Sequence, residues 1–255
     1  MSRHLYKYLR EEVFPTPFCP GCGHGILLQA ILRAIDELSA SGHLDFTKMV
    51  FVSGIGCGAW IPSPHFKADT LHTLHGRAIA YATGVCLTRP DLKVVVISGD
   101  GDLAAIGGNH LIHAARRNLP LVVICANNSI YGMTGGQVSP TTPEGCLTET
   151  TPFGNEERPF DLCRLVKSCE ADYVSRWTVF HTKPLIKAIV KALMSKGFSF
   201  IDVISPCVTQ FGRRNRLFSI YDYFQEIKKV VVSYEKAKVM GKGDLKGKII
   251  IGEYD

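Results

Sequence analysis

The sequence predicts an α/β fold in which a parallel sheet is flanked by helices. Four apolar runs rich in β-branched residues are continuous rather than alternating, which is typical of strands buried on both faces. They are Met49–Ser53, Lys93–Ser98, Leu121–Ala126 and Phe198–Ser205. Segments with helical periodicity lie between them, and alternation of strand and helix favours a parallel sheet with right-handed crossovers.

The helical segments are placed by their periodicity and their end signals. The segment over Leu103–Arg117 ends before Asn118 and Pro120. The segment over Thr182–Lys196 begins at an N-cap residue, Thr182, with Pro184 in its first turn. We therefore expect helices over Gly25–Leu38, Arg77–Leu87, Leu103–Arg117 and Thr182–Lys196.

Two segments lack this alternation. Residues 132–160 are rich in Gly, Thr, Pro and Ser, and a loop of this length inside a compact domain is usually functional. From about Tyr221 we expect a helix, followed by a tail that ends in Lys248–Gly252.

Composition excludes several classes of protein. With 255 residues and 46% hydrophobic content, the chain can bury a substantial core. It has no apolar run of about 18 residues, so we expect no membrane span, and Met1–His4 lack the apolar segment of a secretory signal. Nine cysteines in such a chain favour thiol, metal or redox roles over disulfides, so we expect a reducing cytoplasm.

The net charge of +6 is unevenly distributed. Residues 224–248 hold seven lysines and three acidic residues, and Arg213–Arg216 form a second basic group. A solvated helix and tail would account for this pattern, and a docking surface for an acidic partner is the alternative. We expect no nucleic-acid binding, because the basic residues are not interleaved with aromatic ones and no binding motif is present.

Four cysteines lie at the edges of apolar runs, each beside Gly or Pro: Cys19, Cys22, Cys57 and Cys207. The first two have the C-x2-C spacing of a metal clip, and the others stand 35 residues beyond Cys22 and 150 residues beyond Cys57. Such distant ligands favour an iron–sulfur cluster held by a folded domain, with structural zinc and unrelated buried thiols as the alternatives. We expect structural roles for the remaining five, Cys86, Cys125, Cys146, Cys163 and Cys169.

A second pattern follows two of the predicted strands. One strand runs through Gly99–Asp102 directly into a helix, where glycines and free N–H groups can receive a phosphate. The next strand ends in Asn127–Asn128, which a right-handed crossover places beside Asp100. The carboxylate of Asp100, the side-chain carbonyl of Asn128 and the backbone carbonyl of Ile130 are hard oxygen ligands that suit Mg²⁺. Either motif alone is typical of a turn, but together they predict a diphosphate site with a bound metal.

Longer stretches around these motifs resemble the β subunit of the thiamin-diphosphate-dependent 2-oxoacid:ferredoxin oxidoreductases. The resemblance covers roughly residues 15–215 and rests on Cys19–Gly23, Gly54–Cys57, Leu74–Arg77, Gly99–His110 and Asn128–Gln137. Within that family, Asp102–His110 with Tyr131–Pro140 is most similar to 2-oxoglutarate synthase. The family resemblance implies a diphosphate-type thiamin-binding fold. We expect a domain for thiamin diphosphate and iron–sulfur binding over residues 1–215 and a basic C-terminal helix and tail over residues 216–255.

The resemblance implies roles residue by residue. Asp100, Asn128 and the Ile130 carbonyl would hold Mg²⁺. Thiamin diphosphate would contact Ile55, Gly56, Cys57, Gly58, His75, Gly101, Asp102, Gly132 and Met133. A [4Fe-4S] cluster would be ligated by Cys19, Cys22, Cys57 and Cys207. The chain departs from some relatives at Trp60, where they carry a basic residue that faces the substrate.

The implied reaction is oxidative decarboxylation of a 2-oxoacid, with 2-oxoglutarate converted to succinyl-CoA, CO₂ and reduced ferredoxin. The thiamin adduct would be oxidised one electron at a time by the cluster. Pyruvate, or a branched-chain or aryl 2-oxoacid, is the alternative substrate, and a non-redox thiamin-diphosphate decarboxylase subunit is the alternative enzyme. No catalytic residue is assigned in this chain, because the activating glutamate is expected from a partner α subunit; γ and δ subunits are further candidate partners.

Overall fold

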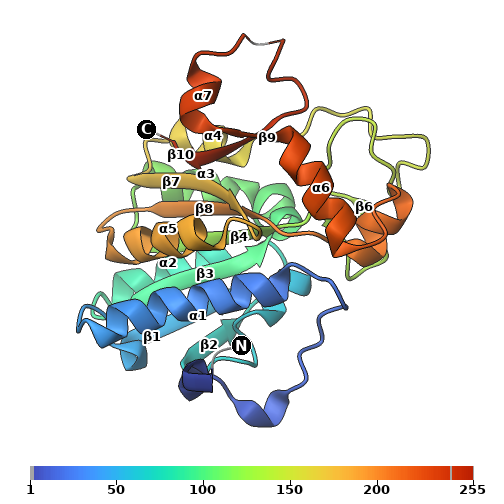
Figure 1. Ribbon diagram of the computed structural model, residues 1–255. Coiled ribbons are helices and arrows are strands. Elements are labelled where there is room, and N and C mark those ends of the chain that lie inside the picture. The colour runs from blue at the N-terminus through green and yellow to red at the C-terminus, as the bar shows by residue number, and fades with distance from the viewer. Residues whose placement is uncertain (1–2, 242, 255) are drawn as a thin grey trace.

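The computed structural model describes residues 3–241 and 243–254, which form an eight-stranded sheet with helices on both faces (Figure 1). The strand order is β2-β1-β3-β4-β8-β7-β10-β9. Four central strands are those expected from the sequence: β1 (Met49–Ser53), β3 (Lys93–Gly99), β4 (Leu121–Asn127) and β8 (Ser199–Ile204). They pair in parallel, so the predicted α/β fold is confirmed.

Successive residues of the central strands face two separate cores. Along β3, Val95 packs into one core and Val96 into the other, because side chains alternate between the faces of a strand. The first face is covered by α1 (His24–Ala40) and α5 (Thr182–Met194), and the second by α2 (Ala78–Thr88), α3 (Gly108–Arg116) and α4 (Leu162–Lys167). Figure 1 shows α1 and α5 in front of the sheet and α2 and α3 behind it.

Four strands of the sheet are not predicted from the sequence: β2 (Asp69–His72), β7 (Tyr173–Thr178), β9 (Val231–Ser233) and β10 (Ile249–Glu253). β7 carries Arg176 in its middle, a residue that ordinarily argues against a buried strand. Its guanidinium is compensated by ion pairs of 2.8 Å to Asp161 and 2.7 Å to Asp202. The apolar pattern therefore missed a strand whose burial depends on paired charges.

The C-terminal segment differs from the helix and tail that we expected. The helix is present as α6 (Ile220–Val230), but the residues expected in the tail form β10, which pairs antiparallel with β7 and parallel with β9. The short helix α7 (Tyr234–Lys238) follows β9. This segment thus extends the edge of the sheet, and the division at residue 215 stays a prediction.

The single helix expected over residues 103–117 is divided into a π-helical turn, η5 (Asp102–Ile106), and α3. The turn at Gly76 approaches this point so closely that a Cβ on Gly76 would lie 2.9 Å from the backbone nitrogen of Gly107. Wide turns of this kind frequently mark functional sites, and this one follows Asp100 directly.

The remaining elements are short. They are the 3₁₀ helices η1 (Arg3–Tyr8), η2 (Glu11–Val13), η3 (Phe46–Lys48) and η4 (Cys57–Trp60), the hairpin strands β5 (Ile130–Tyr131) and β6 (Gln137–Val138), and the π turn η6 (Val208–Gly212). Within residues 132–160, β6 is the regular element, as expected for a long loop. None of the helices formed by the described residues has the length and apolar character that a membrane crossing requires.

Candidate functional site

A cavity of about 140 Å³ lies where β1, β3 and β4 end. Its lining contains every residue that the sequence assigned to thiamin diphosphate or Mg²⁺: Ile55, Gly56, Cys57, Gly58, His75, Asp100, Gly101, Asp102, Asn128, Ile130, Gly132 and Met133. Gly99, Tyr131 and Thr134 complete it. The structure brings these residues together as the sheet topology predicts, and their individual ligand roles stay predictions.

Asp100 is a buried carboxylate beside this cavity, with 1% of its surface exposed. Its Oδ2 accepts hydrogen bonds from the hydroxyls of Ser139 at 2.5 Å and Thr141 at 2.6 Å, and its Oδ1 accepts one from the backbone nitrogen of Asn128 at 3.2 Å. Burial raises the pKa of Asp100, while these hydrogen bonds oppose the shift. A buried carboxylate with no cation beside it is costly, so the site fits a bound metal ion.

The other two predicted Mg²⁺ ligands lie in the tight turn after β4. Ser129 has a φ of 59°, which folds the chain back so that the side-chain oxygen of Asn128 accepts from the nitrogen of Ile130 at 3.2 Å. The Ile130 carbonyl accepts from the nitrogen of Gly132 at 3.0 Å. Each carbonyl oxygen has two lone pairs, so both retain acceptor capacity for a cation.

Asp102 has a different environment from Asp100. Its Oδ1 accepts from the backbone nitrogens of Ile55 at 3.1 Å and Gly76 at 2.7 Å, and Ser98 donates to its Oδ2 at 2.7 Å. The Nδ1 of His75 lies 2.7 Å from the same Oδ1. The side chain that we expected to meet the diphosphate therefore ties the ends of β1 and β3 and the Gly76 turn together, and like charge keeps a carboxylate away from phosphate. A cofactor contact from this residue would fall to its backbone.

Glycines let the backbone approach at this corner. Gly56 has a φ of 126°, a conformation that other residues rarely adopt. A Cβ on Gly58 would lie 3.0 Å from the backbone nitrogen of Gly99. The segment after β1 is thereby held against the end of β3.

The four cysteines assigned to the cluster gather from separate parts of the chain. The pKa of the Cys22 thiol is raised to about 12, by burial and then by the charges of Cys207, Cys57 and Cys19. The pKa of the Cys57 thiol is raised to about 11, by burial and then by the charges of Cys207 and Cys19. The hydroxyl of Thr209 lies 3.6 Å from the sulfur of Cys207 and 3.7 Å from that of Cys19. In the thiolate form these four side chains would repel one another, and a bound metal would supply the compensating positive charge.

Gly132 lies between the cysteine group and the cavity. A Cβ placed on it would be 3.6 Å from the sulfur of Cys207, 3.7 Å from that of Cys57 and 3.8 Å from the Asn128 amide nitrogen. Cys57 itself lines the cavity. The candidate metal cluster and the candidate cofactor pocket are therefore adjacent.

The other predicted residues are in the surroundings of these sites. His24 is buried, and its Nδ1 lies 2.7 Å from the Ser205 hydroxyl, while its backbone nitrogen donates to the sulfur of Cys22. Cys86, Cys125 and Cys163 are buried, whereas Cys146 and Cys169 are partly buried. Trp60 is 38% exposed and does not line the small cavity.

Sequence reasoning missed the hydroxyl residues that support the site: Ser98, Ser139, Thr141 and Thr209. Ser139 and Thr141 belong to the loop over residues 132–160, and its richness in Ser and Thr is the one signal that could have pointed to them. Their partners are fixed by the folding of the loop, which local sequence does not reveal.

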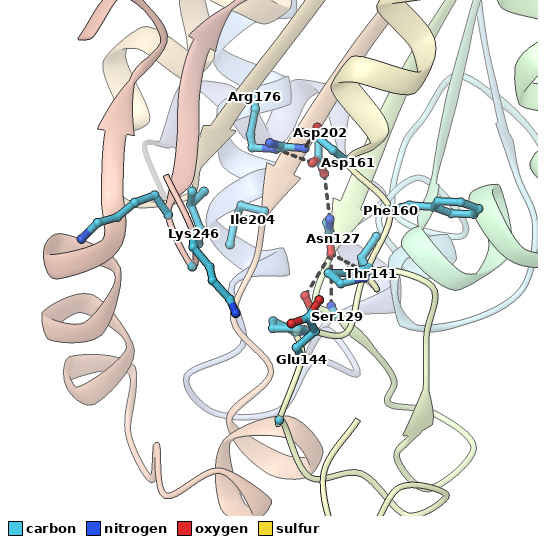
Figure 2. Close-up of a pocket in the computed structure, with 16 residues that line it drawn as sticks. Asn127, Ser129, Thr141, Glu144, Phe160, Asp161, Arg176, Asp202, Ile204 and Lys246 are labelled. Carbon is cyan, nitrogen blue, oxygen red and sulfur yellow. Dashed lines mark hydrogen bonds and ion pairs between the residues drawn. The ribbon is translucent and has the colours of Figure 1, made fainter. Parts of the chain in front are cut away.

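A larger cavity of about 700 Å³ lies beyond β4 and β8 and is shown in Figure 2. It contains none of the predicted site residues. The buried guanidinium of Arg176 donates to Asp202 at 2.7 Å, Tyr254 at 2.9 Å and Asp161 at 2.8 Å. Because these partners occupy the guanidinium, the chemistry of the smaller cavity is the better guide to function.

Comparison with known proteins identifies the family of the chain. Residues 54–203 match the family described as thiamine pyrophosphate enzyme, C-terminal TPP binding domain. The chain is 50% identical over 248 residues to 2-oxoglutarate synthase subunit KorB of Methanothermobacter marburgensis, covering 97% of this chain and 85% of that one. It is 44% identical over 195 residues to the 2-oxoacid:ferredoxin oxidoreductase subunit beta of Saccharolobus solfataricus, covering 75% and 62%.

A solved structure has the same architecture. It is the 2-oxoglutarate:ferredoxin oxidoreductase from Magnetococcus marinus with 2-oxoglutarate, coenzyme A and succinyl-CoA bound. The TM-score is 0.82 with 34% sequence identity, over 98% of this chain and 83% of that one. These matches show that this chain belongs to the thiamine pyrophosphate enzymes, as a β subunit of the 2-oxoacid:ferredoxin oxidoreductases.

Proposed function

We propose that this subunit serves the oxidative decarboxylation of 2-oxoglutarate to succinyl-CoA, with Mg²⁺ and a [4Fe-4S] cluster beside thiamin diphosphate. The observation that carries the proposal is the adjacency of the cofactor cavity and the four cysteines, which share Cys57 and meet at Gly132. A redox centre next to a carbanion-stabilising cofactor suits an oxidative reaction.

For the Mg²⁺ site, the support is the donor set. Asp100 supplies a buried carboxylate, and Asn128 and Ile130 supply carbonyl oxygens with a free lone pair. Among the described residues, no three His, Cys, Asp or Glu side chains form a metal-binding group. This suits Mg²⁺, which takes few protein ligands and completes its shell with phosphate and water oxygens.

For the cluster, the support is the chemistry of the cysteine group. The four cysteines come from separate parts of the chain, whereas structural zinc sites typically take their ligands from closely spaced pairs. An iron–sulfur cluster accepts four thiolates around a larger core. All nine cysteines are free thiols in the structure, as expected in a reducing cytoplasm.

We propose a partner subunit from the lining of the cavity itself. Its acidic lining residues are Asp100 and Asp102, and both are committed to the contacts described above. The glutamate that activates the cofactor is thus proposed to come from an α subunit. Four large apolar side chains near the cavity remain exposed, as a covering partner would require: Ile55 at 40%, Leu74 at 67%, Ile106 at 50% and Met133 at 48%.

The electron acceptor is proposed to be ferredoxin, reached through the exposed edge of the cysteine group. Cys19 is exposed, whereas Cys207 is buried. Arg213 and Arg216 are exposed on the segment that follows Cys207, and positive charge there would attract an acidic carrier. Of the two basic regions noted in the sequence, Arg213–Arg216 lies nearer in the chain to a proposed cluster ligand, Cys207.

The choice of 2-oxoglutarate rests on the names of the similar proteins from Methanothermobacter marburgensis and Magnetococcus marinus. Among the described lining residues of the small cavity there is no Lys or Arg to meet a distal carboxylate. The cation for that carboxylate, like a site for coenzyme A, is therefore proposed to lie on the partner subunit.

The test is anaerobic purification of this chain with and without its α subunit. We expect iron without zinc, bound thiamin diphosphate, and viologen reduction by the pair with coenzyme A and 2-oxoglutarate in preference to pyruvate. Iron-free protein that still decarboxylates would indicate the non-redox enzyme. Activity of the lone chain, or inactivity of the pair with every 2-oxoacid, would sink the proposal.

A further inference from the structure

The two oxygens of Asp100 have unequal surroundings. Oδ2 accepts from the hydroxyls of both Ser139 and Thr141, at 2.5 and 2.6 Å, whereas Oδ1 accepts from the backbone nitrogen of Asn128, at 3.2 Å. Ser139 and Thr141 do not line the cofactor cavity, but Asn128 does. Oδ2 is therefore saturated on the side away from the cavity, and Oδ1 keeps acceptor capacity on the cavity side.

We propose that Ser139 and Thr141 are positioning residues for the metal site: they fix the Asp100 carboxylate so that Oδ1 is presented to Mg²⁺. The inference rests on the proposed function, in which Asp100 holds the ion. Both hydroxyls are buried, with 4% of Ser139 and 7% of Thr141 exposed. A buried hydroxyl is costly unless it is hydrogen-bonded, so space-filling alone would be served better by apolar residues.

Thr141 is in turn anchored to the sheet. Its hydroxyl proton is shared between Asp100 Oδ2 and the side-chain oxygen of Asn127, which lies 3.0 Å away. The Asn127 amide donates to Asp202 Oδ1 at 3.0 Å, and this contact fixes which way the amide points. Asp202 Oδ2 accepts from Arg176 at 2.7 Å. Figure 2 shows this row of side chains from Arg176 through Asp202 and Asn127 to Thr141.

The row gives roles to two sequence features that the proposed function does not use. Asn127, the first residue of the Asn pair, links the loop to β8 and β7 instead of facing the cofactor. The loop over residues 132–160 delivers both hydroxyls to Asp100. Residues that orient a metal ligand in this way typically alter metal affinity by about 10- to 100-fold when they are removed.

The experiment uses the chain purified with its partner subunit and compares Thr141→Val, Thr141→Ser and Ser139→Ala. Mg²⁺-dependent binding of thiamin diphosphate is measured by calorimetry, together with iron content and the melting temperature. We expect Thr141→Val and Ser139→Ala to weaken binding by about 10-fold or more. Thr141→Ser should stay within about twofold, because it keeps the hydroxyl.

Thr178→Val is the matched control. Thr178 is also buried, and its hydroxyl accepts from the backbone nitrogen of Phe180 and bonds to the His181 ring instead of Asp100. Binding unchanged from wild type in both Thr141→Val and Ser139→Ala would overturn the inference. So would equal losses in Thr141→Ser and Thr141→Val at normal iron content and melting temperature, since the hydroxyl would then be irrelevant. Absence of Mg²⁺-dependent binding in the wild type would instead refute the proposed function.

Discussion

At the scale of single residues, the site depends on two buried carboxylates two positions apart. Asp100 keeps one oxygen toward the cavity, while Asp102 uses both oxygens to hold backbone and Ser98. Sequence reasoning predicted Asp100 as a metal ligand from its place at a strand end and, through the family resemblance, expected Asp102 to contact the cofactor. It could not divide their tasks, since the Gly76 turn that Asp102 holds is distant in the chain.

The substitution Asp102→Asn tests this division of roles between Asp100 and Asp102. The amide retains one acceptor oxygen but turns an NH₂ group toward donors, so we expect a loss of about 2–3 kcal/mol in the free energy of unfolding. Urea denaturation of the purified chain measures it. Asp91→Asn is the control, because Asp91 forms an exposed pair with Arg89 that is worth at most about 1 kcal/mol. Equal stability of the two variants would mean that Asp102 does not hold these turns together.

His65 gives a pH prediction. It is buried, its Nδ1 lies 2.6 Å from the carbonyl of Trp60, and burial lowers its pKa. At this residue the unfolded chain then binds more protons than the folded chain below a pH of about 6.5, so the contribution of His65 to stability should fall as the pH drops from 7.5 to 5. His65→Asn keeps a donor for Trp60 but does not titrate, and its urea midpoint should fall less over this range. Parallel pH dependence in the variant and the wild type would contradict this assignment.

At the scale of elements, the sequence predicted what hydrophobic burial determines. β1, β3, β4 and β8 are continuous apolar runs and were found with their boundaries nearly correct. β7 was missed because Arg176 interrupts its pattern, and β10 because it lies in a basic, weakly patterned tail. The loop over residues 132–160 was predicted to be functional, but which of its residues face Asp100 depends on its three-dimensional path.

A substitution at Tyr254 can measure how much the attachment of β10 to the sheet contributes to stability. Its hydroxyl accepts from Arg176 at 2.9 Å and donates to the carbonyl of Ile250 at 3.0 Å. Tyr254→Phe should lower the free energy of unfolding by about 1–3 kcal/mol, because a buried guanidinium loses a partner. Tyr221→Phe, at a residue 65% exposed, should stay within about 0.5 kcal/mol of wild type. No cost in Tyr254→Phe would support a C-terminal unit that is independent of the sheet.

At the scale of the whole molecule, the fold places two candidate centres, the cofactor cavity and the cysteine group, side by side while supplying them from different segments. The cofactor cavity is built from strand ends, whereas the cysteines come from the N-terminal segment, the turn after β1 and the segment after β8. The parallel sheet aligns the carboxyl ends of β1, β4 and β8 at one edge. Gly132, which has no side chain, lies between the centres. Proximity of this kind is what single-electron transfer between the centres requires.

This arrangement predicts that the two centres can be removed separately. Asp100→Ala should reduce thiamin diphosphate retention by about 10-fold or more and leave iron content intact, because Asp100 contacts no cysteine ligand. Cys22→Ser should lose iron and keep the cofactor, since Cys22 does not line the cavity. Cys57→Ser should lose iron and also weaken cofactor binding, because Cys57 belongs to both sites. The measurement is iron and thiamin analysis of the three variants, purified anaerobically with the partner subunit. Loss of both iron and thiamin diphosphate in Asp100→Ala would mean that the fold failed or that the centres are not independent.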